Sequence, residues 1–82
     1  MKIGTVSGAV WATKKADGLT GQILLTVETE RGTVIAADRV GAGTGDCVLV
    51  ACGAAARAED PNIPIDAAVV AILDIQGGTL CQ

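Results

Sequence analysis

Five short runs of apolar and β-branched residues, closely spaced along an 82-residue chain, set the strongest limit on its fold. The runs cover residues 2–13, 22–30, 33–37, 46–52 and 65–75. Turn-forming pairs such as Asp17-Gly18 and Arg31-Gly32 separate some of them. Closely spaced short strands with one helical insert are typical of a small β-barrel. We therefore predict a single, mainly β domain of about five strands.

Two of these runs, residues 46–52 and 65–75, are apolar on both of their faces. In the first, Val48 and Val50 lie on one face and Leu49 and Ala51 on the other. Half of all residues in the chain are apolar, and the mean hydropathy is +0.50. A domain this small buries only about two-thirds of its unfolded surface. We therefore expect a neighbouring subunit to cover one face, so that the protein is an oligomer.

Three glycines at alternate positions, Gly41, Gly43 and Gly45, lie between two strand-like runs. A dinucleotide-binding fingerprint needs a helix after its glycines, but a strand follows here, and the Gly-Lys-Ser/Thr of a Walker loop is missing. Glycine also allows another backbone to approach closely. We therefore favour a structural turn or a subunit contact over phosphate binding.

A short helix is expected at residues 53–60, before two prolines, Pro61 and Pro64, end it. Arg57 in this segment is surrounded by alanines. Two interpretations stay open, because an arginine beside small residues can contact carbonyl or carboxylate groups of another chain or can simply face solvent. The candidates for a subunit interface or a pore are Gly41, Ala42, Gly43, Thr44, Gly45, Asp46, Arg57, Val69 and Val70.

The residues that usually carry catalysis are scarce. The chain has no histidine and one serine, Ser7, so no base is present to activate the hydroxyl. Cys47 and Cys52 lie in an apolar run and are expected to be core residues. Three cysteines at irregular spacing predict neither a disulfide framework nor a zinc site. We expect no catalytic, cofactor-binding or metal-binding residues, and no enzyme.

Charge and hydropathy restrict the partners. The net charge is −3 and Trp11 is the single aromatic residue, so neither a basic surface nor a stacking platform for nucleic acid is expected. No apolar run approaches the roughly 18 residues of a membrane span. Residues 1–4 lead directly into a strand pattern without a signal-peptide core, which predicts a cytoplasmic location.

Read together, several segments resemble the EutN/CcmL family, the pentameric vertex proteins of bacterial microcompartment shells. The matching segments are residues 1–15 (MKIGTVSGAVWATKK), 19–27 (LTGQILLTV), 38–50 (DRVGAGTGDCVLV), 53–57 (GAAAR) and 64–74 (PIDAAVVAILD). They cover nearly the whole chain in order. Asp46 stands where the family often has glutamate, which keeps the charge, and Gly53-Ala54-Ala55 stands where the family often has a serine.

The resemblance implies an OB-like five-stranded barrel, which we place at residues 1–76, and the pair Gly77-Gly78 predicts a flexible tail at 77–82. It implies a homopentamer that caps the vertices of a polyhedral shell, with hexameric shell proteins as partners and no cofactor, nucleic acid or membrane. The alternative function is an OB-like module that binds a small ligand or single-stranded nucleic acid. The resemblance leaves the enclosed pathway open.

Overall fold

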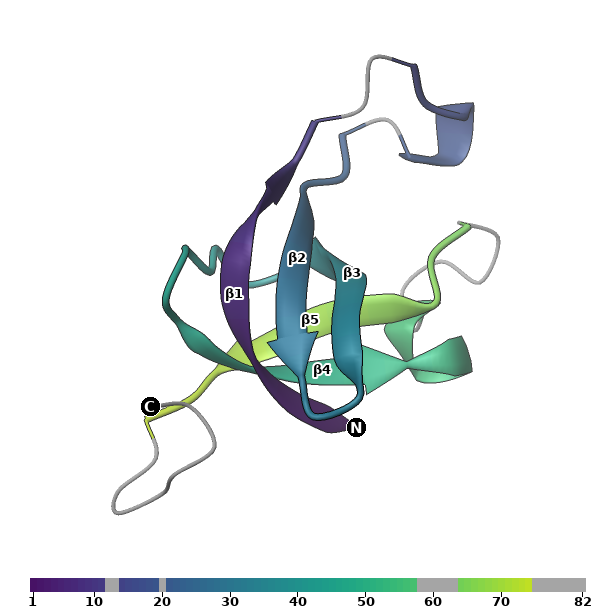
Figure 1. Ribbon diagram of the computed structural model, residues 1–82. Helices are drawn as coiled ribbons and strands as arrows, with labels where there is room; N and C mark the ends of the chain where they lie inside the picture. The colour runs from purple at the N-terminus through teal and green to yellow at the C-terminus, as the bar shows by residue number, and fades with distance from the viewer. Residues whose placement is uncertain (12–13, 20, 58–63, 75–82) are drawn as a thin grey trace.

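Five strands close into a barrel in the order β1-β2-β3-β5-β4, with β4 returning to β1 (Figure 1). The computed structural model describes residues 1–11, 14–19, 21–57 and 64–74. The strands are β1 (Lys2–Val10), β2 (Leu24–Thr29), β3 (Gly32–Asp38), β4 (Cys47–Cys52) and β5 (Ala67–Ile72). Two 3-10 turns complete the fold, η1 (Asp17–Leu19) and η2 (Gly53–Arg57). The predicted mainly β, five-stranded barrel is confirmed.

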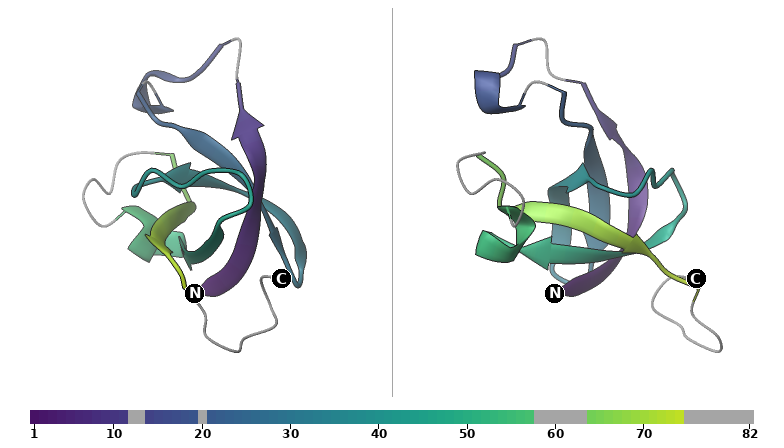
Figure 2. Two further views of the ribbon diagram at one scale, coloured as in Figure 1. Left: turned by 90° about the vertical axis from the view of Figure 1, so that its left-hand side faces the viewer. Right: turned by 180° about the vertical axis from the view of Figure 1, so that it is seen from behind.

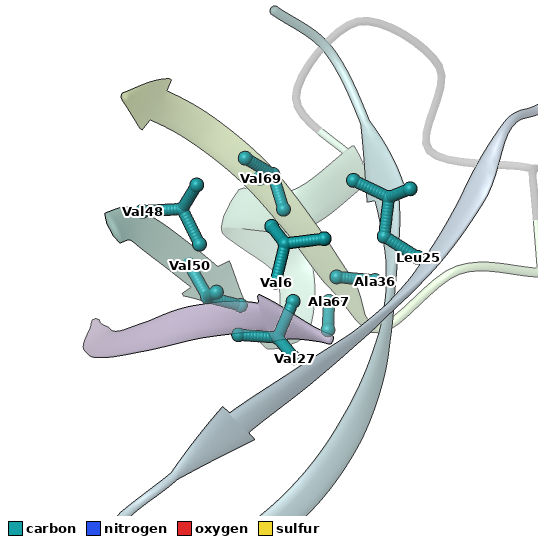
Figure 3. Close-up of a cluster of buried hydrophobic side chains, with 8 residues drawn as sticks. All are labelled: Val6, Leu25, Val27, Ala36, Val48, Val50, Ala67 and Val69. Atoms are coloured by element: carbon teal, nitrogen blue, oxygen red, sulfur yellow. The ribbon is translucent and has the colours of Figure 1, made fainter. Parts of the chain in front are cut away.

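The core lies between two groups of strands that cross steeply, β1, β2 and β3 on one side and β4 and β5 on the other (Figure 1). Each strand sends alternate side chains inward, as its pleat requires. The central cluster draws on all five strands (Figure 3): Val6, Leu25, Val27, Ala36, Val48, Val50, Ala67 and Val69. These side chains are valine, alanine and one leucine, so the interior of the barrel is narrow.

A second, smaller cluster joins η2 to the barrel. Ala56 of η2 packs with Ala37, Ala68 and Ile65, and Leu24 lies against them. Because three of these residues are alanines, η2 can approach the strands closely. This cluster closes the end of the barrel at which β3 and β5 meet.

The turn η1, which lies between β1 and β2 in the sequence, projects beyond the barrel in both views (Figure 2). The opposite end holds the β2–β3 hairpin, whose two-residue turn lies between Thr29 and Gly32. Strand β1 changes register between Val6 and Gly8, and a glycine inside a strand often marks such a bulge. This bulge lets one strand pair with β2 along most of its length and with β4 near its start.

The closure between β3 and β5 is much shorter than the other pairings. The two strands are parallel and share two residue pairs, Ala37 with Ala68 and Asp38 with Val69. By contrast, β2 and β3 pair from Leu24 with Ala37 to Thr29 with Gly32. The barrel is therefore closed at one end of this seam and open at the other.

Several predicted element boundaries are corrected. The strands predicted at residues 2–13, 22–30 and 65–75 are shorter and span Lys2–Val10, Leu24–Thr29 and Ala67–Ile72. The connection predicted as a plain turn contains η1. The helix predicted at 53–60 is a 3-10 turn over Gly53–Arg57, and residues 58–60 lie outside the described residues, as does the tail predicted at 77–82.

The expectation of two core cysteines without a disulfide is wrong. Cys47 is half-buried and disulfide-bonded, whereas Cys52 is a free, exposed thiol. Cys52 is the last residue of β4 and borders the open end of the seam, so its side chain reaches the surface. The inward positions of this strand belong to Val48 and Val50.

Replacing Gly4 by alanine should destabilise the barrel by about 1–3 kcal/mol, the usual cost of an overpacked core. An added Cβ would lie 2.6 Å from both the Glu28 carbonyl oxygen and Val27 Cγ1. Gly8→Ala is the matched control in the same strand, because its nearest neighbour, Thr26 Oγ1, is 3.6 Å away. Thermal unfolding followed by circular dichroism should show a lower midpoint for Gly4→Ala than for Gly8→Ala; equal midpoints would contradict the packing argument.

Candidate subunit interface

The glycine loop, residues 39–46, connects β3 to β4 and is shaped by an aspartate at its start. One oxygen of the Asp38 carboxylate, Oδ1, accepts hydrogen bonds from the backbone N–H groups of Val40, Gly41 and Ala42, at 3.1, 3.1 and 3.2 Å. Gly41 has φ +77°, a conformation that glycine adopts without strain. The first half of the loop therefore curls around its own carboxylate.

A second aspartate holds the other half of the loop. The N–H of Gly43 donates to Asp46 Oδ2 at 2.8 Å, and the N–H of Asp46 donates back to the Gly43 carbonyl at 3.0 Å. The N–H of Gly45, with φ +92°, donates to the Val6 carbonyl at 2.8 Å, and the N–H of Val6 donates to the Asp46 carbonyl at 3.0 Å. These bonds fix the end of the loop to β1.

The backbone N–H groups that could bind a phosphate instead form hydrogen bonds within the protein. Anion-binding loops aim consecutive free N–H groups at the ligand. Here the N–H groups at positions 40–43, 45 and 46 all donate to carboxylate or carbonyl oxygens of the chain itself. Two carboxylates inside the loop also repel an anion. The geometry agrees with the structural interpretation of the glycines.

The candidate residues of the glycine loop fall into an exposed group and a partly buried group. Gly41, Gly43, Thr44 and Gly45 are exposed, and Thr44 lies at the tip. Ala42 instead packs against the barrel core, and Asp46 is half-buried. The tip therefore offers backbone and one hydroxyl to a neighbour, while Ala42 anchors the loop to the subunit.

The two valines predicted together at the interface face different ways. Val69 is fully buried among the inward side chains of the barrel, so its side chain cannot take part in a surface contact. Val70 is 36% exposed, and Ile72 beyond it is 48% exposed. Adjacent strand residues point to opposite faces, which separates the pair. Val70 therefore stays a candidate for the interface, whereas the side chain of Val69 belongs to the barrel core.

Arg57 is half-buried, and its Nη1 donates to the Ile65 carbonyl at 2.7 Å. This bond ties the end of η2 to the segment that leads into β5. The arginine thus has a role within its own subunit that neither of the two interpretations named. The structure of one chain does not bring Arg57 together with the glycine loop.

Sequence reasoning missed several large apolar side chains on the surface. Trp11 is 89%, Ile23 61% and Ile35 53% exposed. In β3 the small Ala36 points inward and the large Ile35 outward, the reverse of what hydrophobicity alone favours. The alternation Ile35, Ala36, Ala37 gave no signal of this, because any of the three residues suits a core.

A polar cluster on the outer face of β1, β2 and β3 was also missed. The Glu28 carboxylate accepts hydrogen bonds from the hydroxyls of Thr33 and Ser7, and Ser7 Oγ lies 2.7 Å from Thr26 Oγ1. The bond from Thr33, followed by that from Ser7, lowers the pKa of Glu28 below its ordinary value. This face therefore keeps a negative charge at neutral pH.

Within the described ranges, the structure gathers no three histidine, cysteine or acidic side chains that could hold a metal ion. In that same part of the chain, no helix has the length and apolarity to cross a membrane. The surface features that remain are the anchored glycine loop and the exposed apolar side chains of several strands.

A family model described as ethanolamine utilisation protein EutN/carboxysome matches residues 1–74. The chain belongs to the EutN/CcmL family. It is 47% identical to the carboxysome shell vertex protein CcmL of Thermosynechococcus vestitus, over 90% of this chain and 84% of that protein. The resemblance drawn from the sequence is thereby confirmed.

Solved structures of EutN/CcmL proteins share the barrel. The GrpN pentameric microcompartment shell protein of Rhodospirillum rubrum superposes with a TM-score of 0.85, at 38% identity, over 96% of this chain and 100% of that one. CcmL of Nostoc sp. gives a TM-score of 0.86 at 38% identity, over 94% and 93% of the two chains. These relatives are structural shell proteins, so the expectation of a shell protein and not an enzyme is confirmed.

Replacing Asp38 by alanine should loosen the glycine loop, because three N–H groups lose their common acceptor. We expect a loss of about 1–2 kcal/mol in the free energy of unfolding, within the range for bonds to a charged group at an accessible site. Glu30→Ala removes an exposed acid from the β2–β3 turn and serves as the control. Chemical denaturation measures both variants, and a Glu30→Ala midpoint as low as that of Asp38→Ala would refute the role of the carboxylate.

Proposed function

We propose that five copies of this chain form a closed ring that occupies a vertex of a bacterial microcompartment shell. The observation that carries the proposal is the near full-length likeness to a solved shell protein that is itself described as pentameric. The functional unit is therefore the ring and not the single chain.

The surface of one subunit supports ring formation. A cyclic ring uses heterologous contacts, in which two different patches of each subunit meet. Exposed apolar side chains occur on separate elements: Ile35 on β3, Val70 and Ile72 on β5, and Trp11 after β1. Burying such residues between copies removes apolar area from water at about 25 cal/mol per Å². It also compensates for the small core of an 82-residue domain.

The proposed partners of the ring are hexameric shell proteins that form the facets. A flat layer of six-fold units cannot close into a polyhedron, and five-fold units at the corners supply the curvature. This role depends on the shape and symmetry of the ring and needs no cofactor. We assign the exposed tip of the glycine loop, residues 43–45, to contacts between subunits or to the rim of a pore on the ring axis.

The alternative function, an OB-like module for single-stranded nucleic acid, fits the surface poorly. OB-fold proteins bind their ligands over the face of strands 2 and 3. In this chain that face carries the Glu28 carboxylate, held in its charged form by Thr33 and Ser7. A negative charge at this position repels a phosphate backbone.

Native mass spectrometry at neutral pH tests the proposal. We expect a species of five times the 8.2 kDa chain mass, stable on dilution to micromolar subunit concentration. Titration of the same sample with a fluorescent single-stranded oligonucleotide at low salt should show no binding. A stable monomer would refute the ring, and oligonucleotide binding with a steep salt dependence would revive the alternative.

Arg57→Ala should weaken the ring more than Lys15→Ala. Loss of the bond to the Ile65 carbonyl releases the end of η2 from the segment before β5, at a cost of about 1 kcal/mol or more. Lys15 is exposed in the β1–β2 connection and serves as the charge-matched control. The measurement is the denaturant midpoint of ring dissociation for each variant, and equal midpoints would exclude a role for Arg57 in assembly.

A further inference from the structure

Within the described ranges, one edge of β3 has no strand partner over half of its length. The N–H of Asp38 donates towards β2, to the Ile23 carbonyl at 2.7 Å, and the N–H of Arg39 donates towards β5, to the Val69 carbonyl at 3.1 Å. Backbone groups of successive strand residues point to opposite sides, so those of Thr33 and Ile35 point the same way as those of Arg39, away from β2. Strand β5 first pairs with β3 at Ala37, so in the described part of the chain it leaves this edge uncovered.

An open hollow of about 560 Å³ lies beside this free edge. Residues 33–35 form one wall, Cys52, Gly53, Asp66 and Ala67 form the other, and Lys2 of β1 also lines the hollow. The N–H of Gly53 donates to the Asp66 carbonyl at 2.7 Å, which holds the segment before β5 against β4 and away from β3. The hollow therefore lies where the segment before β5 stays next to β4 and does not pair with β3.

Among the residues that the structure describes, strand β5 also has an edge without a strand partner, at the other end of the same seam. Its last pair with β3 is Val69 with Asp38, where β3 ends, and β5 continues to Ile72. Val70 and Ile72 are exposed apolar residues on this extension, just as Ile35 is on the uncovered half of β3. The offset between two parallel strands thus leaves two different free edges on one subunit, each with apolar side chains.

Free strand edges are templates for pairing with another chain, and soluble proteins usually cover them. The two edges of this seam differ from one another, which is what a heterologous, head-to-tail contact requires. We propose that in the ring the free edge of β3, at Thr33 and Ile35, pairs with the free edge of β5, at residues 70–72, of the neighbouring copy. This inference rests on the proposed pentamer and names the surfaces that form it.

Other candidate contacts are weaker for backbone pairing. Most N–H groups of the glycine loop already donate to Asp38, Asp46 and Val6, and Arg57 donates to its own subunit. The edge at Thr33 and Ile35 is different, because pairing there adds hydrogen bonds without breaking any that β3 makes with β2. Strand addition of this kind is a recurrent mode of recognition between chains.

The decisive variant is Ile35→Pro. Proline removes the N–H of residue 35, which points to the free edge, and leaves the bonds between β3 and β2 in place; proline is tolerated at such edge positions. Ile35→Ala is the matched control, because it removes the apolar side chain and keeps the N–H. We expect Ile35→Pro to show the far-ultraviolet circular dichroism of the wild type but to lose the pentamer in native mass spectrometry, while Ile35→Ala retains it.

Hydrogen exchange on the unaltered protein provides a second, independent test. We expect the amides of Thr33 and Ile35 to exchange slowly in the pentamer and rapidly in the monomer obtained with mild denaturant. An intact Ile35→Pro pentamer, or rapid exchange at both amides in the wild-type pentamer, would overturn the inference and leave the proposed function standing. A wild-type chain that is monomeric would refute the proposed function itself.

Discussion

The volume available inside the barrel governs the rest of this structure. The inward positions hold valine and alanine with a single leucine, so the strands can close tightly around a narrow core. The large apolar residues Ile35, Trp11 and Ile72 lie outside this core and are exposed. A core of this size is small for a stable monomer. The apolar side chains that lie outside it are available for contacts between copies of the chain.

Much of the fold could be predicted from the sequence because its strands alternate or run continuously apolar between turn signals. The five strands and the barrel followed from that pattern. The 3-10 character of η2 could not be predicted, because a short run of small residues suits either helix type. The packing of Ala56 against residues of β3 and β5 is a tertiary contact that the local sequence does not encode.

The sequence could nominate residues for a subunit interface but could not say how the fold places them. Val69 and Val70 cannot be told apart by composition, since only the register of β5 against β4 decides which one points inward. The roles of Asp38 and Asp46 as acceptors for the glycine loop depend on a backbone path that no local pattern encodes. Likewise, the exposed edge of β3 arises from where β5 begins, which is a property of the closed barrel and not of either strand.

The bonds from Asp38 and Asp46 have a consequence for how copies of the chain associate. A glycine-rich loop that is mobile in the free subunit would lose backbone entropy on contact with a neighbour, at roughly 1–2 kcal/mol for each residue fixed. Here the two carboxylates and β1 already hold the loop in one shape. That entropy is lost during folding, so the subunit meets its neighbour with a preorganised surface and more of the contact energy remains for association.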